Sequence, residues 1–259
     1  MKTATFTFLF FLLNFNLIAQ STFIAHRGAS YLAPENTVAS AKLAWELGAD
    51  AVEVDVHLSE DNRIMVIHDK STRRTCSNKK NLEIRNAPSI ILRDLDAGNK
   101  KGKEFKGEKI PFLEEIIATI PKGKTLVVEI KCGADILNPL RRVIERSGKA
   151  DQITFISFGW KTILKTQKAF PDNQCYWLCA LKPGLKKKMA EAAKEGLAGV
   201  NLKHSMIDKA IVDWAKSLNL KVLSWTVDDP VEAKRLSDLG VAGITTNRPK
   251  WLKEKMLKL

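Results

Sequence analysis

Short apolar runs alternate with amphipathic segments along most of the chain. Eight runs have the length and composition of strands: 23–26, 51–57, 125–131, 153–158, 174–180, 199–202, 221–227 and 243–246. Between them, apolar positions recur with a helical period over 35–47, 112–120, 138–147, 160–169, 185–194, 207–218 and 230–239. This alternation predicts parallel strands joined by helical crossovers. Eight such units in a chain of this length predict an α/β fold, a TIM (β/α)8 barrel. A doubly wound open sheet is the alternative, and the absence of a GxGxxG motif after the first run counts against it.

One further apolar run, 64–68, breaks the alternation. Only residues 59–63 separate it from the second strand, and a crossover helix needs roughly a dozen residues. We therefore predict an extra antiparallel strand that forms a hairpin with the second strand, with His68 roughly opposite Glu53. From about 71 to 110 the chain is polar, basic and without a period, which indicates an insertion that covers the same end of the barrel. We treat 21–259 as one barrel domain.

The first twenty residues differ from the rest of the chain. A single Lys2 precedes an apolar run over 6–18, and small or polar residues follow it. This pattern is typical of a secretory signal peptide, which we assign to 1–20. A membrane anchor is the alternative, but a span needs about 20 predominantly apolar residues and this run is shorter. We expect an exported protein, periplasmic or secreted, without a stable membrane anchor after cleavage.

Composition and charge narrow the class of protein only a little. The chain has 259 residues, of which 45% are hydrophobic and 27% charged, as in globular proteins. The net charge of +13 is compatible with acidic partners, but no nucleic-acid-binding motif accompanies it, so we expect none of that class. The cysteines follow no zinc-binding or disulfide-scaffold pattern and are predicted to be thiols of the core: Cys76, Cys132, Cys175 and Cys179. The oligomeric state is not indicated.

Two carboxylates lie in the second strand, "AVEVDVHL". Glu53 and Asp55 alternate with valines, so both acids face one side of the sheet and the valines face the other. Buried together, the two carboxylates would raise each other's pKa unless a positive charge lay between them. A hard divalent cation, Ca²⁺ or Mg²⁺, satisfies that need, because both ions prefer carboxylate oxygen. An exposed edge strand with alternating charge is the alternative, although strands are predicted on both sides.

The next parallel strand repeats the pattern in "LVVEIK". Glu129 and Lys131 share a face, with Val128 and Ile130 on the other. Glu129 would supply a third metal ligand, and Lys131 a cation suited to a phosphate oxygen. An ion pair inside the barrel without any ligand is the alternative.

Two histidines each follow an apolar run and adjoin another ionisable group. His26 precedes Arg27, and His68 precedes Asp69. Because the ordinary pKa of histidine is near neutral, one could accept a proton while the other donates one. A lone histidine is more often a core residue, and we assign His57 and His204 that structural role.

Taken together, the motifs resemble the glycerophosphodiester phosphodiesterase family. The segments that carry the resemblance are "HRGAS", "APENT", "GADAVEVDVHLSEDNRIMVIHD", "EIK", "SWTVDD" and "GVAGITTNRP", and they extend from His26 to Pro249 in the family's order. The segment "LRDLDAGNKKGKEFKGEKIPFLEE" is also similar to the family's insertion after the second strand.

The resemblance implies a TIM barrel that binds one divalent cation and hydrolyses small-molecule glycerophosphodiesters to sn-glycerol 3-phosphate and an alcohol. It implies a metal site at Glu53, Asp55 and Glu129, and a general acid/base pair at His26 and His68. It further implies substrate binding by Arg27 and Lys131, which contact the phosphate, and by Trp225, which packs against the glycerol or alcohol part. Glu35 and Asn36 are expected to orient Arg27 and to cap the first helix.

Two other functions compete with this one. A lipid-directed phosphodiesterase, such as a lysophospholipase D, would need an apolar lip on its loops, and the polar insertion offers none. A non-catalytic module that binds phosphorylated ligands would be expected to have lost some of the acids or histidines. The reaction can follow two routes, attack by a glycerol hydroxyl through a cyclic phosphate or direct attack by water. The sequence does not distinguish between them.

Overall fold

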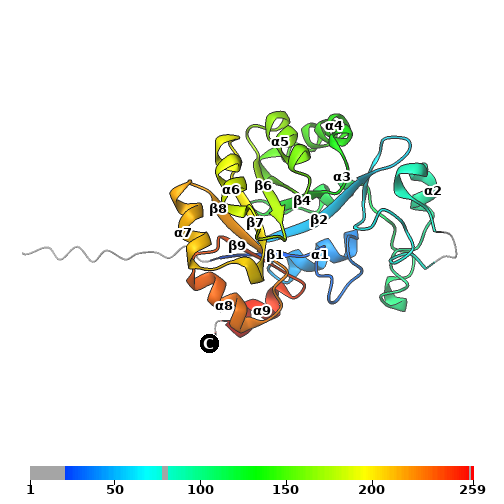
Figure 1. Ribbon diagram of the computed structural model, residues 1–259. Coiled ribbons are helices and arrows are strands. Elements are labelled where there is room, and N and C mark those ends of the chain that lie inside the picture. The colour runs from blue at the N-terminus through cyan, green and yellow to red at the C-terminus, as the bar shows by residue number, and fades with distance from the viewer. Residues whose placement is uncertain (1–20, 78–80, 257) are drawn as a thin grey trace, which may run out of the picture.

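The computed structural model describes residues 21–77, 81–256 and 258–259, and its central element is a closed barrel of parallel strands (Figure 1). The strands of the barrel are β1 (Thr22–Ala25), β2 (Ala51–Leu58), β4 (Thr125–Ile130), β5 (Ile153–Ser157), β6 (Gln174–Cys179), β7 (Gly199–Lys203), β8 (Lys221–Trp225) and β9 (Gly243–Thr246). They pair in the order β1-β9-β8-β7-β6-β5-β4-β2, and β2 pairs again with β1. The predicted TIM barrel is therefore confirmed, and the open sheet is wrong.

The strand pairs of the barrel differ in length. Six registered residue pairs join β2 to β4, whereas two pairs, Ile24 with Ala51 and Ala25 with Val52, join β1 to β2. The backbone N–H of Phe23, in β1, also donates to the carboxylate of Asp50, just before β2, at 3.0 Å. This bond supports the short junction next to its two registered pairs. The junction between β1 and β2 is thus held by few backbone contacts.

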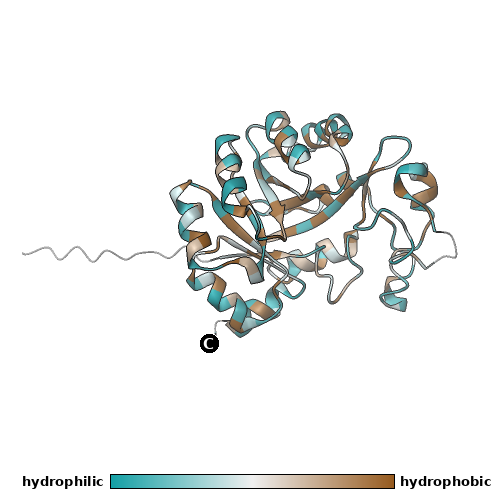
Figure 2. Ribbon diagram, in the orientation of Figure 1, coloured by the Kyte–Doolittle hydropathy of each residue, from teal (hydrophilic) through white to brown (hydrophobic). Residues whose placement is uncertain are grey.

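Helices cover the outside of the barrel, as the amphipathic pattern predicts. They are α1 (Val38–Glu46), α3 (Leu113–Ala118), α4 (Leu137–Ser147), α5 (Trp160–Ala169), α6 (Leu185–Lys194), α7 (Lys209–Ser217), α8 (Pro230–Asp238) and α9 (Pro249–Met256). The main hydrophobic core lies between these helices and the outward-facing strand residues. Figure 2 shows hydrophobic residues concentrated on the strands and polar residues on the outer faces of the helices. Short 3₁₀ turns, η3 (Ala134–Ile136), η4 (Ala150–Gln152) and η5 (His204–Met206), connect some of these elements.

The sequence analysis missed α9. Its buried residues Pro249, Leu252 and Met256 follow a helical spacing, but lysines occupy much of the segment between them and mask the period. The lysine-rich sequence of this helix therefore resembles that of a charged, solvent-exposed tail.

The extra strand β3 (Ile64–Val66) pairs antiparallel with β2, as predicted. The register sets Val66 opposite Val56, and its continuation brings His68 level with Val54, one residue from the predicted position. The insertion that follows shows no period in the sequence, yet the structure contains short helical elements there. It contains η1 (Ile84–Asn86), α2 (Ser89–Arg93) and η2 (Lys103–Phe105), which are too short to produce a visible period.

The insertion has a small hydrophobic core of its own. That core is built on the outer face of β3 and consists of Met65, Ile67, Cys76, Ile84, Ala87, Leu92, Leu95, Ala97 and Ile110. In Figure 1 the insertion extends from the end of β2, beside the barrel.

Two remaining predictions concern the cysteines and the N-terminal segment. All four cysteines are free thiols, and burial raises the pKa of Cys132 to about 11 and of Cys175 to about 12, as expected for unreactive core thiols. The predicted signal peptide lies outside the described residues. Among the residues that the structure describes, no helix is long and apolar enough to cross a membrane.

Candidate active site

Three carboxylates converge at the carboxyl ends of β2 and β4. The alternation of β2 brings Glu53 and Asp55 to the inside of the barrel, and the parallel register places Glu129 directly beside Asp55. All three side chains are buried, and an oxygen of each lies within 4.8 Å of the other two. Since β2 pairs with β1 and β4 on its two sides, the alternative of an exposed edge strand is wrong.

The electrostatics of this acidic triad favour a bound cation. Burial, followed by the charges of Asp55 and Glu129, raises the pKa of Glu53 well above its ordinary value. Burial and the neighbouring Asp55 raise the pKa of Glu129 to about 7. Three adjacent carboxylates remain ionised at neutral pH most easily when positive charge lies among them. Their oxygen ligands suit a hard divalent metal, so the triad could hold one.

Two basic side chains adjoin the triad. The Nζ of Lys131 lies 2.8 Å from Glu129 Oε1 and 3.5 Å from Asp55 Oδ1. Burial lowers the pKa of Lys131, but the carboxylates of Glu129 and Asp55 outweigh that effect and raise it. The Nε of Arg27 lies 3.4 Å from Asp55 Oδ2, and its Nη1 donates to Glu35 Oε1 at 2.9 Å. Lys131 therefore stays charged, and both basic side chains line the same pocket as Glu53 and Glu129.

The backbone at Arg27 adopts an unusual conformation. Its φ of 57° lies in the left-handed region, and its N–H donates to Glu53 Oε2 at 2.9 Å. The next residue, Gly28, has a φ of 80°, and a Cβ there would lie 2.4 Å from the Ser40 hydroxyl. Only glycine fits this turn. A strained turn of this kind is common at functional sites, because surrounding contacts hold it in place.

Asn36 supports Asp55 rather than the first helix. Its Nδ2 donates to Asp55 Oδ2 at 2.8 Å, and its Oδ1 accepts the Asp55 N–H at 3.1 Å. The N-cap of α1 is Thr37, whose hydroxyl accepts the Ser40 N–H, so the predicted capping role of Glu35 and Asn36 is wrong. The predicted contact between Glu35 and Arg27 is present.

The hydrogen bonds around His26 fix its tautomer. Its Nδ1 lies 2.8 Å from Asn247 Oδ1, while the amide nitrogen of Asn247 donates to Asp228. A carboxylate accepts only, so the amide NH₂ must face Asp228 and the amide oxygen must face His26. The Nδ1 of His26 therefore carries the proton, and its Nε2 is free to accept one. Burial, followed by the charge of Arg27, lowers the pKa of His26, which favours the neutral ring.

His68 has a different partner. Its Nδ1 lies 2.6 Å from Asp69 Oδ1. Burial raises the pKa of Asp69, but its bonds to Arg74 and His68 outweigh that effect and lower it to about 2. The ionised Asp69 accepts a hydrogen bond from His68 Nδ1, which holds the His68 ring in place at the pocket. The Nε2 of His57 donates to the His68 carbonyl at 3.1 Å, which is a structural role.

Arg74, in the insertion, connects the two sides of the site. Its Nη1 and Nη2 donate to the Glu35 oxygens at 2.6 and 2.7 Å, and its Nε donates to Asp69 Oδ2 at 2.7 Å. Arg74 thus holds the partner of Arg27 and the partner of His68 at once. Sequence reasoning missed this residue, since nothing in the pattern distinguishes it from the adjacent Arg73.

A pocket of about 110 Å³ joins most of the predicted residues. Its lining includes His26, Arg27, Glu53, His68, Glu129, Lys131 and Trp225, while Asp55 lies beneath the surface. Phe158, at the end of β5, meets the Trp225 ring edge-on at 5.4 Å and was not predicted, although it too follows an apolar strand. Asn247 and Asp228 were also missed, because they act through His26 from distant parts of the chain. His204 pairs with Glu232, outside this pocket.

Comparisons with known proteins agree with this geometry. The Glycerophosphoryl diester phosphodiesterase family matches residues 26–251. A glycerophosphodiester phosphodiesterase of Caldanaerobacter subterraneus is 33% identical over 235 residues, which cover 88% of this chain and 95% of the relative. A solved phosphodiesterase of Oleispira antarctica, in complex with the product sn-glycerol-3-phosphate, is 29% identical with a TM-score of 0.85 and covers 92% of this chain and 97% of that one. A glycerophosphodiester phosphodiesterase of Parabacteroides distasonis is 25% identical with a TM-score of 0.77, over 92% of this chain and 98% of that one. The chain belongs to the glycerophosphoryl diester phosphodiesterase family.

Proposed function

We propose that this protein hydrolyses glycerophosphodiesters to sn-glycerol 3-phosphate and an alcohol, with one divalent cation and two histidines. The observation that carries the proposal is one pocket lined by Glu53 and Glu129 of the acidic triad, by the cations Arg27 and Lys131, and by the rings of His26 and His68. The family relationship supports it, as does the Oleispira structure, whose bound product is sn-glycerol-3-phosphate.

Glu53, Asp55 and Glu129 hold the cation in this proposal, either Ca²⁺ or Mg²⁺. A bound divalent ion supplies positive charge that stabilises the negative charge developing on phosphate oxygens. Arg27 and Lys131 would add to that positive charge, and the Arg27 guanidinium can bind two phosphate oxygens at once. Trp225 packs against the glycerol or alcohol part, with its Nε1 held by the Asn201 carbonyl at 3.2 Å.

The hydrogen bonds divide the acid and base roles between the histidines. His26 is neutral, with Nε2 unprotonated and Nδ1 bonded to Asn247, so it is the general base. His68 lines the same pocket with its Nδ1 bonded to Asp69, so we assign it the other role, that of the general acid. His26 Nε2 takes a proton from the attacking hydroxyl, of glycerol or of water. A new P–O bond forms, the P–O bond to the alcohol breaks, and His68 protonates the departing oxygen. Attack by water gives sn-glycerol 3-phosphate directly, whereas attack by the glycerol hydroxyl gives a cyclic phosphate, which water then opens to the same product.

The first test is release of glycerol 3-phosphate from glycerophosphocholine and glycerophosphoethanolamine by the mature protein. The assay is run in EDTA and then with Ca²⁺ or Mg²⁺ restored. We expect no release in EDTA and recovery with at least one of the ions. No release with either ion, from a protein that is folded by circular dichroism, would contradict the proposal.

Lysophosphatidylcholine serves as the matched lipid substrate, because it differs from glycerophosphocholine by one acyl chain. Faster hydrolysis of the lipid would mean that the natural substrate is a lysophospholipid and not a small glycerophosphodiester, with the same type of reaction. Binding of glycerol 3-phosphate without turnover of either substrate would favour a non-catalytic module.

We also propose that the enzyme acts after export, on the basis of the pattern in 1–20. Amino-terminal sequencing of the secreted or periplasmic protein tests this. A start close to Ser21 is expected, whereas retention of Met1 on a cytosolic protein would contradict export.

A further inference from the structure

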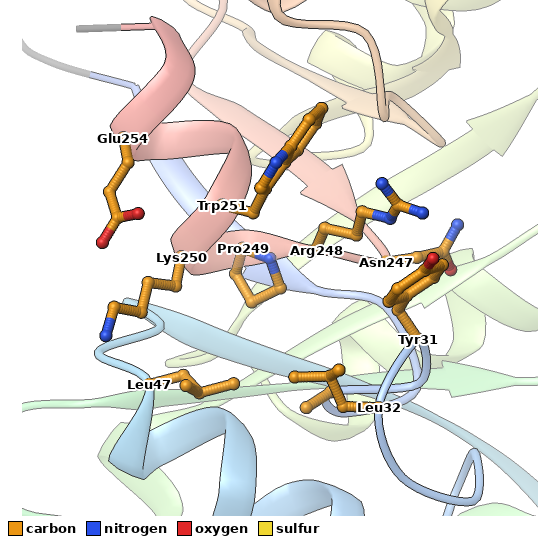
Figure 3. A pocket seen from close by; sticks show the side chains of 10 residues that line it. Tyr31, Leu32, Leu47, Asn247, Arg248, Pro249, Lys250, Trp251 and Glu254 are labelled. Carbon is orange, nitrogen blue, oxygen red and sulfur yellow. The ribbon is translucent and has the colours of Figure 1, made fainter.

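An apolar groove lies next to the catalytic pocket, between the loop after β1 and the start of α9. Its volume is about 220 Å³. Figure 3 shows Leu32 and Leu47 beneath Pro249, with Tyr31 and Asn247 at one end and Lys250 at the other. Asn247 also bonds to His26, so one end of this groove adjoins the active site.

The rim of the groove exposes large hydrophobic side chains. Tyr31 is 54% exposed, Leu32 53% and Trp251 36%. These residues come from two segments far apart in sequence that line one groove, so they form a contiguous patch rather than scattered single residues. A contiguous exposed apolar patch with a polar rim is typical of an interaction surface.

Arg248 gives the patch its charge. Its guanidinium lies 3.5 Å from the Tyr31 ring centre and 5.1 Å from that of Trp251. Among the described residues, no carboxylate comes within ion-pair distance of this guanidinium. The aromatic rings therefore hold a cation in place without neutralising it.

Other cations surround the same patch. Lys250 is exposed on its rim, and Lys101 donates to the carbonyls of Ser30 and Tyr31 at 2.7 and 2.8 Å. Glu254 is the acidic member of the lining, and Figure 3 shows it beyond Lys250, away from Arg248. The patch thus has a positive balance, in a chain of net charge +13.

We propose that this patch, formed by Tyr31, Leu32, Arg248, Lys250 and Trp251, docks the protein on an anionic phospholipid bilayer. Aromatic and aliphatic side chains beside basic ones are the composition of an interfacial binding surface. Tyrosine and tryptophan rings locate at the level of the headgroups, and arginine and lysine are attracted to anionic lipids there. The proposal stands apart from the catalytic function, since none of these five side chains is placed in the reaction.

Co-sedimentation with phospholipid vesicles tests the proposal. The mature protein is mixed in EDTA with vesicles of phosphatidylcholine containing about a third phosphatidylglycerol, and separately with pure phosphatidylcholine. We expect binding to the anionic vesicles, and weaker binding as the salt concentration rises. Arg248→Gln should weaken the binding about fivefold, which is the contribution of one basic residue near an anionic surface. Leu32→Ser should weaken it about tenfold through lost apolar burial.

The matched control is Ile90→Ser, on α2 in the insertion. Ile90 is 67% exposed, so the same kind of surface change is made away from the patch. It should bind vesicles within twofold of the unaltered protein, and all three variants should melt at the same temperature because the changed residues are not buried.

Three outcomes would overturn the proposal. The first is no binding of the unaltered protein to anionic vesicles at low salt. The second is salt-sensitive binding that Arg248→Gln and Leu32→Ser leave unchanged, which would mean general adsorption of a basic protein. The third is a concentration-dependent dimer that the same two changes abolish while vesicle binding persists, which would assign the patch to a second copy of the chain.

Discussion

Replacing Arg74 by alanine should lower the catalytic rate strongly while it lowers the free energy of unfolding only slightly. The Arg74 side chain is 46% exposed and bonds the carboxylates of Glu35 and Asp69. Exposed ion pairs contribute about 0–1 kcal/mol, so the free energy of unfolding should fall by about 1 kcal/mol or less. The effect on catalysis should be larger, because Glu35 holds Arg27 and Asp69 holds His68. A misplacement of about 1 Å at reacting groups can reduce the rate about 100-fold, so we expect kcat/KM to fall by about 10- to 100-fold.

The pH profile provides a second measurement on the same variant. The bonds to Arg74 lower the pKa of Glu35 and of Asp69, against the opposing effect of burial. Without Arg74, both carboxylates should protonate at higher pH, and the acid limb of kcat/KM should move upward. Arg74→Lys retains the charge but cannot bond both carboxylates with a planar fork, so it should restore only part of the activity.

Arg63→Ala is the matched control for this experiment. Arg63 is 45% exposed and pairs with Glu114, at the outer end of the hairpin and outside the catalytic pocket. It should lose a similar small amount of stability and keep its kcat/KM. Equal kcat/KM for the two alanine variants would refute the positioning role of Arg74.

Further predictions concern the histidines and the acidic triad. His26→Ala and His68→Ala should each lower kcat about 10²- to 10⁴-fold in a steady-state assay, while isothermal titration shows unchanged cation binding; full activity in either would remove its assigned role. Glu53→Gln should abolish the rise in melting temperature that Ca²⁺ or Mg²⁺ produces, yet stabilise the EDTA-treated protein near pH 8, because burial and its acidic neighbours raise the Glu53 pKa. Glu129 has a pKa of about 7 in the fold against 4.5 ordinarily, so the metal-free fold holds its proton more tightly than the unfolded chain does. Urea unfolding in EDTA should therefore show the unaltered protein losing stability relative to Glu129→Gln as pH rises from about 4.5 to 7, by on the order of 3 kcal/mol, and a difference that does not change with pH would contradict this.

Much of the barrel follows from local pattern. Strands and helices of ordinary length leave a period in the sequence, and the short spacing after β2 leaves room only for a hairpin. What the pattern misses is either too short, such as α2, or disguised by charge, such as α9. In α9 the lysines occupy outward positions, while three buried residues, Pro249, Leu252 and Met256, carry the helical signal.

The candidate site divides in the same way. Glu53, Asp55 and Glu129 can be predicted because strand alternation and parallel register are local rules that also fix which side chains meet. The residues that orient the histidines are different. Asn247 reaches His26 across 221 positions of sequence, and Arg74 reaches Glu35 across 39. Such contacts form only in the folded barrel, so a local sequence pattern cannot predict them.

The short junction between β1 and β2 has a consequence for how the barrel opens. Two registered pairs hold this seam, and directly above them the Arg27 N–H reaches across it to the Glu53 carboxylate. A cation that fixes Glu53 therefore also stabilises one of the two shortest strand junctions of the barrel, the other being that of β8 and β9. Amide hydrogens of β1 should exchange with deuterium more slowly when the ion is present, by a larger factor than those of β4 and β5, whose seam is longer. Binding of the cation in the active site would then also stabilise the pairing of β1 with β2.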